Sequence, residues 1–290
     1  MIKNITYGSD PEFFIYNKDI EKVVPSTFLV EGVKDSPYEL GDDFKILRDN
    51  ILVEGNVPVT TTESGFIHSI IELKSRIVKY LKDKYESLEI ISSDCMELDP
   101  IYLTDPEALL FGCDPYLNAW DDDIHKANDL SSVNYRTAGF HVHIGYDRDD
   151  ECSLSQLTMN KLIARAFDLF VVIPSYIEQF DIRRFGNYGG VGQYRDTPYG
   201  LECRSLGSYF SNNEYLLWVI RQTNKALDYV NKEENLYSLL YMEKPTLKTN
   251  SNGEFLFDSS IYDELNISFE EQLFNIKKLD YVRNIWMDRK

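Results

Sequence analysis

The stretch Ala138–Tyr146 (AGFHVHIGY) alternates apolar and polar side chains. Because successive side chains of a β-strand point to opposite faces, this pattern predicts a strand with one face against a core. The apolar face begins at Phe140, and His141 and His143 share the opposite face. The chain has only four histidines, so two at this spacing are a more specific signal than one would be. We therefore expect this strand to contribute polar groups to a functional face of a sheet.

Three other segments show a related alternation and are also predicted as strands: Glu12–Tyr16 (EFFIY), Asn50–Asn56 (NILVEGN) and Leu201–Gly207. Each carries acidic or basic side chains on one of its two faces. If the four strands pair in one sheet, one face collects Glu12, Glu54, His141, His143, Glu202 and Arg204. The residues before the first of these segments, Gly8–Pro11, read as a turn because of their glycine and proline.

The rest of the chain mixes helices and strands without a strict β–α–β order. Helices are predicted from apolar spacing over Glu63–Tyr85, Ser153–Ile177, Asn213–Lys232 and from about Ser268 onward. A strand over Leu88–Ser92, an irregular acidic stretch over Asp94–Asn134 and a hairpin turn at Asn250–Gly253 complete the pattern. In the second helix, Ser153 and Gln156 form a plausible capping box. No linker is evident, so we expect one α+β domain over 1–290 with an antiparallel sheet.

The composition excludes several classes of protein. The 290 residues include 30 Lys and Arg against 48 Asp and Glu, for a formal net charge of −18. Nucleic acids and anionic membranes are bound by basic surfaces, so neither is an expected partner. An apolar content of 43% indicates a globular chain. There is no apolar run of about 18 residues and no signal-peptide pattern, and the four scattered cysteines suggest free thiols in a reducing, cytoplasmic compartment.

The predicted polar face has the composition of a divalent-metal site. Three carboxylates and two imidazoles in one cleft would suit Mg²⁺ or Mn²⁺, because oxygen-rich ligand sets favour hard cations and an imidazole is compatible with Mn²⁺. The alternative is that the glutamates are ordinary outward residues in contact with water, which is the more common role of a single Glu on a strand.

The segment Arg183–Arg204 (RRFGNYGGVGQYRDTPYGLECR) runs against the charge of the whole chain. It holds four arginines, two acidic residues and five of the 15 glycines. Glycine allows close approach of the backbone to a ligand, and arginine binds phosphate or carboxylate in a bidentate way, so the segment is typical of a phosphate-handling loop. The alternative is a surface loop whose arginines pair with nearby acids. Neither a Walker motif nor a dinucleotide-binding glycine motif occurs.

Five motifs, taken in order, resemble a known family. They are Gly8–Phe14 (GSDPEFF), Arg48–Pro58 (RDNILVEGNVP), Phe111–Pro115 (FGCDP), Arg136–Gly145 (RTAGFHVHIG) and Tyr194–Arg204 (YRDTPYGLECR). In this order the chain resembles the phage-associated carboxylate–amine ligases, which are related to glutamine synthetase and glutamate–cysteine ligase. The likeness covers about residues 7–210, and the helices over about 213–290 are expected to complete the same domain.

The resemblance implies a curved antiparallel sheet of the glutamine synthetase and glutamate–cysteine ligase type, with the active site on the concave face and helices on the outer face. It implies that Glu12, Glu54 and Glu202 hold Mg²⁺ or Mn²⁺. His141 matches a histidine near the metals and the ATP phosphates, so it is expected as a metal ligand and as part of the ATP site. His143, its neighbour on the same face, is expected to take part in ATP binding as well.

Four arginines are assigned by the same resemblance. Arg195 and Arg204 match arginines that neutralise phosphate or touch the substrate carboxylate. Arg183 and Arg184 are further candidates for ATP binding. One position departs from the family pattern, because Phe140 replaces a small residue. Phe140 lies on the apolar face, so the change is expected to concern core packing.

The implied activity is an ATP-dependent ligation of a carboxylate to an amine through an acyl phosphate, which forms an amide or peptide-like bond. Its substrates would be small molecules or peptides, and its location the cytoplasm, that of the host if a phage encodes it. Relatives range from monomers to rings, so a homo-oligomer is compatible with the resemblance. Two alternatives remain: a metal-dependent amide or peptide hydrolase that uses the same acidic and histidine cluster, and a non-catalytic protein that keeps the fold as a structural or interaction module.

Overall fold

The computed structural model describes residues 1–104, 116–121, 124–125, 133–149, 152–185, 188–251 and 255–274. The strands are β1 (Ile2–Asn17), β2 (Lys22–Val24), β3 (Tyr38–Gly41), β4 (Phe44–Asp49), β5 (Leu52–Asn56), β6 (Leu88–Ile91), β7 (Cys95–Glu97), β8 (Tyr116–Asn118), β9 (Ile124–His125), β10 (Tyr135–Thr137), β11 (Phe140–Arg148), β12 (Gln193–Thr197), β13 (Gly200–Cys203), β14 (Leu247–Thr249) and β15 (Phe255–Phe257). The helices are α1 (Glu63–Lys82), α3 (Gln156–Phe167), α4 (Ile173–Glu178), α5 (Ile182–Phe185), α6 (Asn213–Val230), α7 (Glu233–Tyr241) and α8 (Ser260–Glu264). A π-helical segment, η3 (Asp168–Val172), joins α3 to α4.

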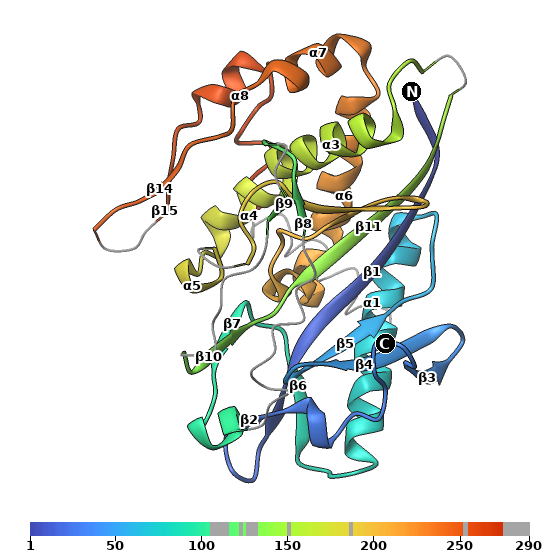
Figure 1. Ribbon diagram of the computed structural model, residues 1–290, viewed down its shortest axis with the longest axis vertical. Coiled ribbons are helices and arrows are strands. Elements are labelled where there is room, and N and C mark those ends of the chain that lie inside the picture. The colour runs from blue at the N-terminus through green and yellow to red at the C-terminus, as the bar shows by residue number, and fades with distance from the viewer. Residues whose placement is uncertain are drawn as a thin grey trace, which may run out of the picture.

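These elements form a mixed α/β structure around one large sheet (Figure 1). The sheet has the order β3-β4-β5-β1-β11-β13-β12-β8-β9, and β2 and β6 also pair with β1. The strand pairs in this sheet are antiparallel, as the sequence predicted. Two small sheets, β7 with β10 and β14 with β15, complete the described part.

The central strand β1 corrects one prediction. Gly8–Pro11 do not form a turn but pair with Phe140–His143 of β11 in continuous register. A proline inside a sheet is normally unfavourable because it cannot donate to the ladder. Here the pairing of β1 with β5 begins only at Glu12, so Pro11 is not part of that ladder. The strand can therefore continue through a sequence that has the composition of a turn.

Helices cover the apolar face of the sheet. Phe140, Val142 and Ile144 of β11 are fully buried and belong to one hydrophobic cluster with Phe66 of α1 and Leu162 of α3. The cluster also takes in the apolar face of α6. Phe140 therefore has the packing role expected for it. Because this face is covered, the side chains on the other face of the same strands are left to form a site.

Side chains cap the first turns of α1 and α3. The Thr62 hydroxyl accepts a hydrogen bond from the Gly65 amide at 3.0 Å, so α1 begins at Glu63 as predicted, but it ends at Lys82 and not at residue 85. The predicted second helix begins later than expected, because Ser155, not Ser153, caps it by accepting from the Thr158 amide at 3.1 Å. The helical run then passes through η3 into α4.

Other differences are local. The irregular stretch after 94 contains the short strands β7, β8 and β9, and Asn50 lies in the turn between β4 and β5 with a φ of 57°. The strand predicted up to Gly207 ends at Cys203. The hairpin predicted near Asn250 is present as β14 and β15, which Figure 1 shows projecting from the rest of the chain.

Some predictions fall partly or wholly outside the described residues. Ser268–Phe274 form turns and bends, not the start of a helix, and the remainder of that predicted helix lies outside the described ranges, as does the motif Phe111–Pro115. Cys95, Cys152 and Cys203 are free thiols. Among the helices in the described ranges, none is both long and apolar enough to span a bilayer.

Candidate metal and anion site

Strand register places charged residues side by side on the face opposite the helices. Asp10 of β1 is paired with His141 of β11, and two residues further along β1, Glu12 is paired with Glu54 of β5. Because side chains two residues apart on a strand share a face, all four point to the same side of the sheet. On this face, β1 thus places Asp10 next to β11 and Glu12 next to β5.

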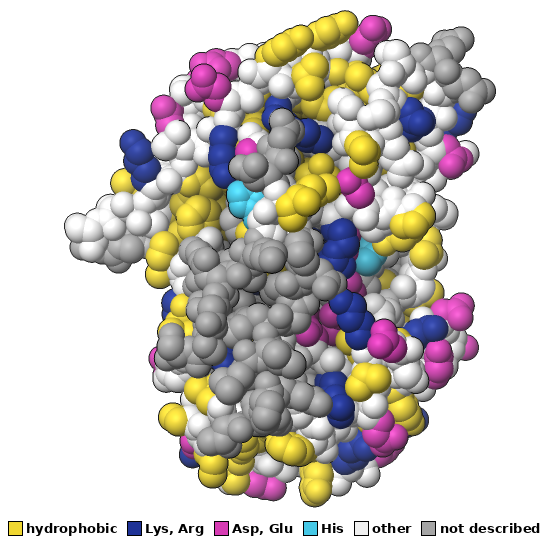
Figure 2. Space-filling model, viewed as in Figure 1, with side chains coloured by type: hydrophobic (Ala, Val, Ile, Leu, Met, Phe, Trp, Pro, Cys, Tyr) yellow, Lys and Arg dark blue, Asp and Glu magenta, His cyan; other side chains and the backbone are white. Residues whose placement is uncertain are grey.

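The same face continues onto the next two strands. Glu202 of β13 is paired with His143 of β11 on one side and with Arg195 of β12 on the other. Figure 2 shows acidic side chains in a recess near the middle of this face, with basic side chains beside them. The structure therefore brings together the predicted set Glu12, Glu54, His141, His143, Glu202 and Arg204.

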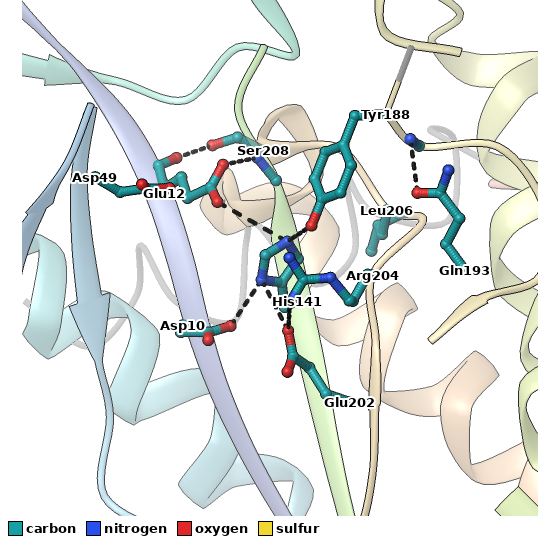
Figure 3. Close-up of polar contacts among 12 residues, drawn as sticks. Asp10, Glu12, Asp49, His141, Tyr188, Gln193, Glu202, Arg204, Leu206 and Ser208 are labelled. Carbon is teal, nitrogen blue, oxygen red and sulfur yellow. Dashed lines mark hydrogen bonds and ion pairs between the residues drawn. The ribbon is translucent and has the colours of Figure 1, made fainter. Parts of the chain in front are cut away.

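Asp10, His141 and Glu202 form the first of two ligand groups (Figure 3). His141 Nδ1 lies 3.1 Å from Asp10 Oδ1 and 3.3 Å from Glu202 Oε1. His141 is only 2% exposed, and its Nδ1 and Asp10 Oδ1 contact each other as an ion pair without forming a hydrogen bond within the described ranges. Carboxylate oxygens gathered around one imidazole nitrogen have the arrangement expected of ligands that face a cation.

Glu12, Asp49 and Glu54 form the second group, with ligand atoms within 4.8 Å of one another. Burial, with a further contribution from the Glu12 charge, raises the pKa of Asp49 to about 7. Burial and the neighbouring charges of Asp10 and Asp49 raise the pKa of Glu54 well above its ordinary value. Carboxylates that are crowded in this way hold protons unless a cation takes their place.

Glu12 and His141 connect the two groups. His141 Nε2 lies 3.9 Å from Glu12 Oε1, and the Gly139 amide donates to Glu12 Oε2 at 2.5 Å. Gly139 must lack a side chain, because a Cβ there would lie 2.6 Å from His141 Nε2. The hydroxyl of Tyr188 also lies 3.1 Å from that nitrogen. Nε2 is thus occupied by protein groups, whereas Nδ1 faces the carboxylates of the first group.

Two arginines approach the acidic groups from the side of β12 and β13. Arg204 pairs with Glu202 Oε1, and Arg195 Nη1 lies 3.1 Å from Glu202 Oε2. Burial alone would lower the pKa of Arg204, but Tyr188 and Glu202 outweigh it and raise that pKa above its ordinary value. Arg204 therefore remains charged, and each of the two arginines is held in place by one oxygen of the same carboxylate.

The other two predicted arginines are placed differently. Arg184 is buried, donates to the Leu206 carbonyl at 2.9 Å and leaves Nε and Nη1 without a hydrogen-bond partner in the described residues. Arg183 contacts other residues than those of the two ligand groups. It pairs with Asp181 at 2.7 Å, and its guanidinium lies 5.6 Å from the Tyr135 ring centroid.

His143 lies at the edge of the first group. Its Nε2 is 3.0 Å from Asp10 Oδ1, and its Nδ1 is 2.8 Å from the Tyr199 hydroxyl, whose ring stacks on the imidazole. Burial alone would lower the pKa of His143, but Asp10 outweighs it and raises this pKa. In turn, the two histidines outweigh the effect of burial on Asp10 and leave the pKa of its carboxyl below the ordinary value.

Three residues of the site are not among the predicted ones: Asp10, Asp49 and Tyr188. Asp10 lies two residues before Glu12, so the alternation rule would have found it if Gly8–Pro11 had not been assigned to a turn. Asp49 is the last residue of β4, just before the point where the predicted strand began. Tyr188 follows α5, in a segment without strand or helix periodicity, so no sequence pattern pointed to it.

The donor set of the two groups fits divalent cations. It consists of five carboxylates and one imidazole, all of which are donors used by Mg²⁺ or Mn²⁺ sites. The close grouping of these ligand atoms and the raised carboxyl pKa values both describe a place where added positive charge would be favourable. The residues present therefore suit the metals that the sequence analysis expected.

Comparisons with known proteins agree with the sequence motifs. A family model described as "Phage phiEco32-like COOH.NH2 ligase-type 2" matches residues 83–227, which is half of the chain. No curated protein matches the chain. A solved structure, "GmaS/ADP complex-Conformation 1", is similar over 78% of this chain with 10% sequence identity and a TM-score of 0.35. The chain spans about half of that structure, 55% of its length.

Proposed function

Because the chain belongs to the phage phiEco32-like COOH.NH2 ligase-type 2 family, we propose that it is an ATP-dependent ligase that joins a carboxylate to an amine through an acyl phosphate. Its substrates are small-molecule or peptide carboxylates and amines. We also propose that the sheet is the curved sheet of the glutamine synthetase type, with the site on its concave face. The observation that carries the proposal is the presence of two carboxylate-rich ligand groups and two charged arginines on one face of the sheet.

The reaction brings several negative charges together, and the site has the means to neutralise them. In the first step an oxygen of the substrate carboxylate attacks the γ-phosphorus of ATP, and ADP leaves. In the second step the amine nitrogen attacks the acyl carbon, phosphate leaves and the amine loses a proton. Divalent cations bound to the two groups would neutralise phosphate oxygens and the reacting carboxylate.

The arginines have the positions required for charge neutralisation. Arg195 and Arg204 are each anchored through one oxygen of Glu202, and the buried Nε of Arg204 has no hydrogen-bond partner among the described residues. Guanidinium groups held in this way are suited to meet an anion. An arginine that meets the transferring phosphoryl group is worth on the order of 10³-fold in rate. Because both are already oriented before a ligand arrives, little reorganisation is needed at the moment of reaction.

The alternative hydrolase would use the same acidic groups without a nucleotide. It has no need of two fixed arginines beside the ligand groups, whereas phosphate transfer does. A non-catalytic role has no need of buried carboxylates that hold protons, because such groups make folding less favourable at neutral pH. These two features favour the ligase over both alternatives.

The test measures nucleotide binding and turnover separately. Binding of a non-hydrolysable ATP analogue with Mn²⁺ is followed by calorimetry, and phosphate release from ATP is followed with carboxylates and with hydroxylamine as a general amine acceptor. We expect micromolar to millimolar binding of the analogue only when Mn²⁺ is present, and hydroxamate formation with an accepted carboxylate. Glu202→Gln should remove both, because it loses a metal ligand and the anchor of two arginines.

The matched control is Glu97→Gln on β7, an exposed glutamate outside the ligand groups. It should bind and turn over like the unmodified protein. Cleavage of amide substrates without ATP would support the hydrolase and contradict the ligase. Retained turnover in Glu202→Gln would show that the site has been assigned to the wrong residues.

A further inference from the structure

A cavity of about 580 Å³ lies next to β12 and has no part in the proposed reaction. Its wall is formed by β8, β9 and β12, by the end of α5 and by the segment Lys244–Leu247. A volume of this size accommodates a drug-sized molecule. The residues that decide its chemistry are Tyr116, His125, Phe185, Gln193 and Lys244.

The cavity lies on the same face of the sheet as the ligand groups. Arg195, which contacts Glu202, and Gln193, which lines the cavity, are two residues apart on β12 and therefore point to the same side. Gln193 is paired with Asn118 of β8 in the sheet register. A substrate that reacts at the acidic groups can therefore extend along this face into the cavity.

Gln193 presents a hydrogen-bond donor that the protein does not use. Its side chain is only 6% exposed, and its Oε1 accepts from the Gly189 amide at 2.9 Å, as Figure 3 shows. That bond fixes which end of the carboxamide carries the N–H groups. Among the described residues Nε2 has no hydrogen-bond partner, and Gln193 lines the cavity. A ligand that offers an acceptor oxygen would satisfy it.

By contrast, both ends of the neighbouring Asn118 carboxamide form hydrogen bonds with the protein. Its Nδ2 donates to the Val191 carbonyl at 3.1 Å, and its Oδ1 accepts from the Trp120 amide at 2.9 Å. Asn118 thus supports the wall of the cavity, whereas Gln193 is available to a ligand.

The charge of the cavity favours an anion. Lys244 lies in its wall and forms no ion pair within the described residues, and no acidic side chain of those residues lines the cavity. Two aromatic rings, Tyr116 and His125, stack with their centroids 5.7 Å apart at an angle of 14°, and Phe185 adds a third ring. Flat aromatic walls favour a flat or aromatic ligand, since such rings stack or meet edge to face.

The cavity is separated from the reacting groups by Tyr188. The Tyr116 ring lies 6.3 Å from the Tyr188 ring, and the Tyr188 ring lies 6.0 Å from the imidazole of His141. An anion held at Lys244 is therefore not the group that reacts beside His141. It belongs to the other end of the molecule.

We propose that this cavity binds the non-reacting end of the organic substrate, and that this end is an aromatic carboxylate such as the C-terminus of a peptide ending in an aromatic residue. The ligand is called a substrate because the protein is proposed to be a ligase, so that part of the proposal rests on the proposed function. The binding of the ligand in the cavity does not. Lys244 and Gln193 hold the carboxylate, and Tyr116, His125 and Phe185 hold the ring.

The test uses N-acetyl-L-phenylalanine as the probe, without nucleotide, and measures its affinity by calorimetry or ligand-observed NMR. N-acetyl-L-phenylalaninamide lacks the charge and N-acetyl-L-alanine lacks the ring, so each should bind roughly tenfold more weakly or worse. Lys244→Ala should weaken the acid by about tenfold and leave the amide unchanged. Lys248→Ala, which removes an exposed lysine from β14, is the matched control and should have no effect.

Gln193→Glu provides the sharper variant. The new carboxylate can still accept from the Gly189 amide, so the local structure is kept, but the free donor becomes an anion. Binding of the acid should be lost, with an unchanged thermal unfolding midpoint. Equal affinity for acid and amide, or an unchanged affinity in Gln193→Glu, would overturn the proposal.

A competition experiment with nucleotide distinguishes failure of this proposal from failure of the proposed ligase function. If the ATP analogue with Mn²⁺ displaces the probe, the cavity is part of the nucleotide site and the proposal fails. If the probe binds as expected but no nucleotide binds, the cavity assignment stands and the ligase fails. Lys244→Ala should bind the analogue as the unmodified protein does, because Lys244 lies outside the two ligand groups.

Discussion

The hydroxyl of Tyr188 lies 3.1 Å from Nε2 of His141, and the opposite ring nitrogen, Nδ1, faces the carboxylates of the first ligand group. A histidine that binds a metal through Nδ1 must carry its proton on Nε2, and a hydrogen bond at Nε2 keeps it there. Two guanidinium groups, those of Arg184 and Arg204, lie 5.3 and 5.4 Å from the Tyr188 ring centroid and hold the ring in place.

Tyr188→Phe should therefore weaken Mn²⁺ binding by about tenfold, the usual cost of losing the hydrogen bond that orients a ligating histidine. The ring and its contacts with the arginines would remain, so the fold should be unaffected. Electron paramagnetic resonance of free Mn²⁺ gives the affinity directly. The exposed Tyr237, changed to Phe, is the control. Equal affinities in the two variants would mean that the Tyr188 hydroxyl does not act on the metal site.

The affinity for divalent cations should rise with pH around neutrality. Asp49 has a pKa of about 7 and that of Glu54 is well above its ordinary value, so both carboxyls compete for protons in the absence of a cation. Below pH 7 a proton must leave before a cation binds, which lowers the affinity by up to about tenfold per pH unit for each protonated carboxyl. Calorimetry in two buffers of different ionisation enthalpy would count the protons released. Binding that releases no proton between pH 6 and 7 would contradict this account.

The metal-free protein should lose stability as the pH rises from about 4 to 7. Asp49 has a raised pKa in the folded state, so the folded chain holds a proton that the unfolded chain has already released. Its contribution to the free energy of unfolding is therefore largest below pH 4 and falls until the pH passes 7. Asp49→Asn should remove this pH-dependent contribution of the Asp49 carboxyl. It should therefore stabilise the metal-free protein at pH 8 by on the order of 2–4 kcal/mol.

Denaturant unfolding with a chelator at pH 5 and pH 8 measures this effect. Adding Mg²⁺ at pH 8 should restore stability to the unmodified protein but less so to Asp49→Asn, which has lost a ligand. Asp35→Asn, at an exposed position, serves as the control and should keep the original pH profile. If Asp49→Asn proves destabilising at pH 8 without metal, the charged Asp49 carboxylate does not destabilise the folded protein as inferred.

Gly139 should not tolerate a side chain. A Cβ there would lie 2.6 Å from His141 Nε2 and 3.4 Å from Glu12 Oε2, so Gly139→Ala must displace His141 and adds a methyl group in contact with Glu12. We expect a loss of about 1–3 kcal/mol in unfolding free energy together with a clear loss of Mn²⁺ affinity. Gly8→Ala is matched to it, because its Cβ would meet only the His143 side chain at an ordinary 3.5 Å. Similar metal affinities in the two variants would show that the site adapts to the added methyl group.

Much of the site follows from one local rule. Alternation along each strand gives the face of that strand on which Glu12, Glu54, His141, His143 and Glu202 lie, because side-chain direction on a strand depends only on position. The pairing of these strands in one sheet brings the five residues to one face. The amphipathic helices were likewise predictable, since their apolar spacing belongs to each segment alone. The residues at which helices and strands begin and end were less predictable from the sequence. Ser155 caps α3 in place of Ser153, and Asn50, the predicted first residue of a strand, lies in the turn between β4 and β5.

The sequence by itself determined which side chains share a face and that the chain belongs with the carboxylate–amine ligases by its motifs. Only the tertiary structure decided which of these side chains meet. Asp10 joins His141 because the ladder between β1 and β11 continues through Pro11, and Asp49 joins Glu12 because β4 and β5 turn back beside β1. Tyr188 reaches His141 from a segment with no periodicity. Strand register and loop paths arise from contacts between distant segments, and no local pattern encodes them.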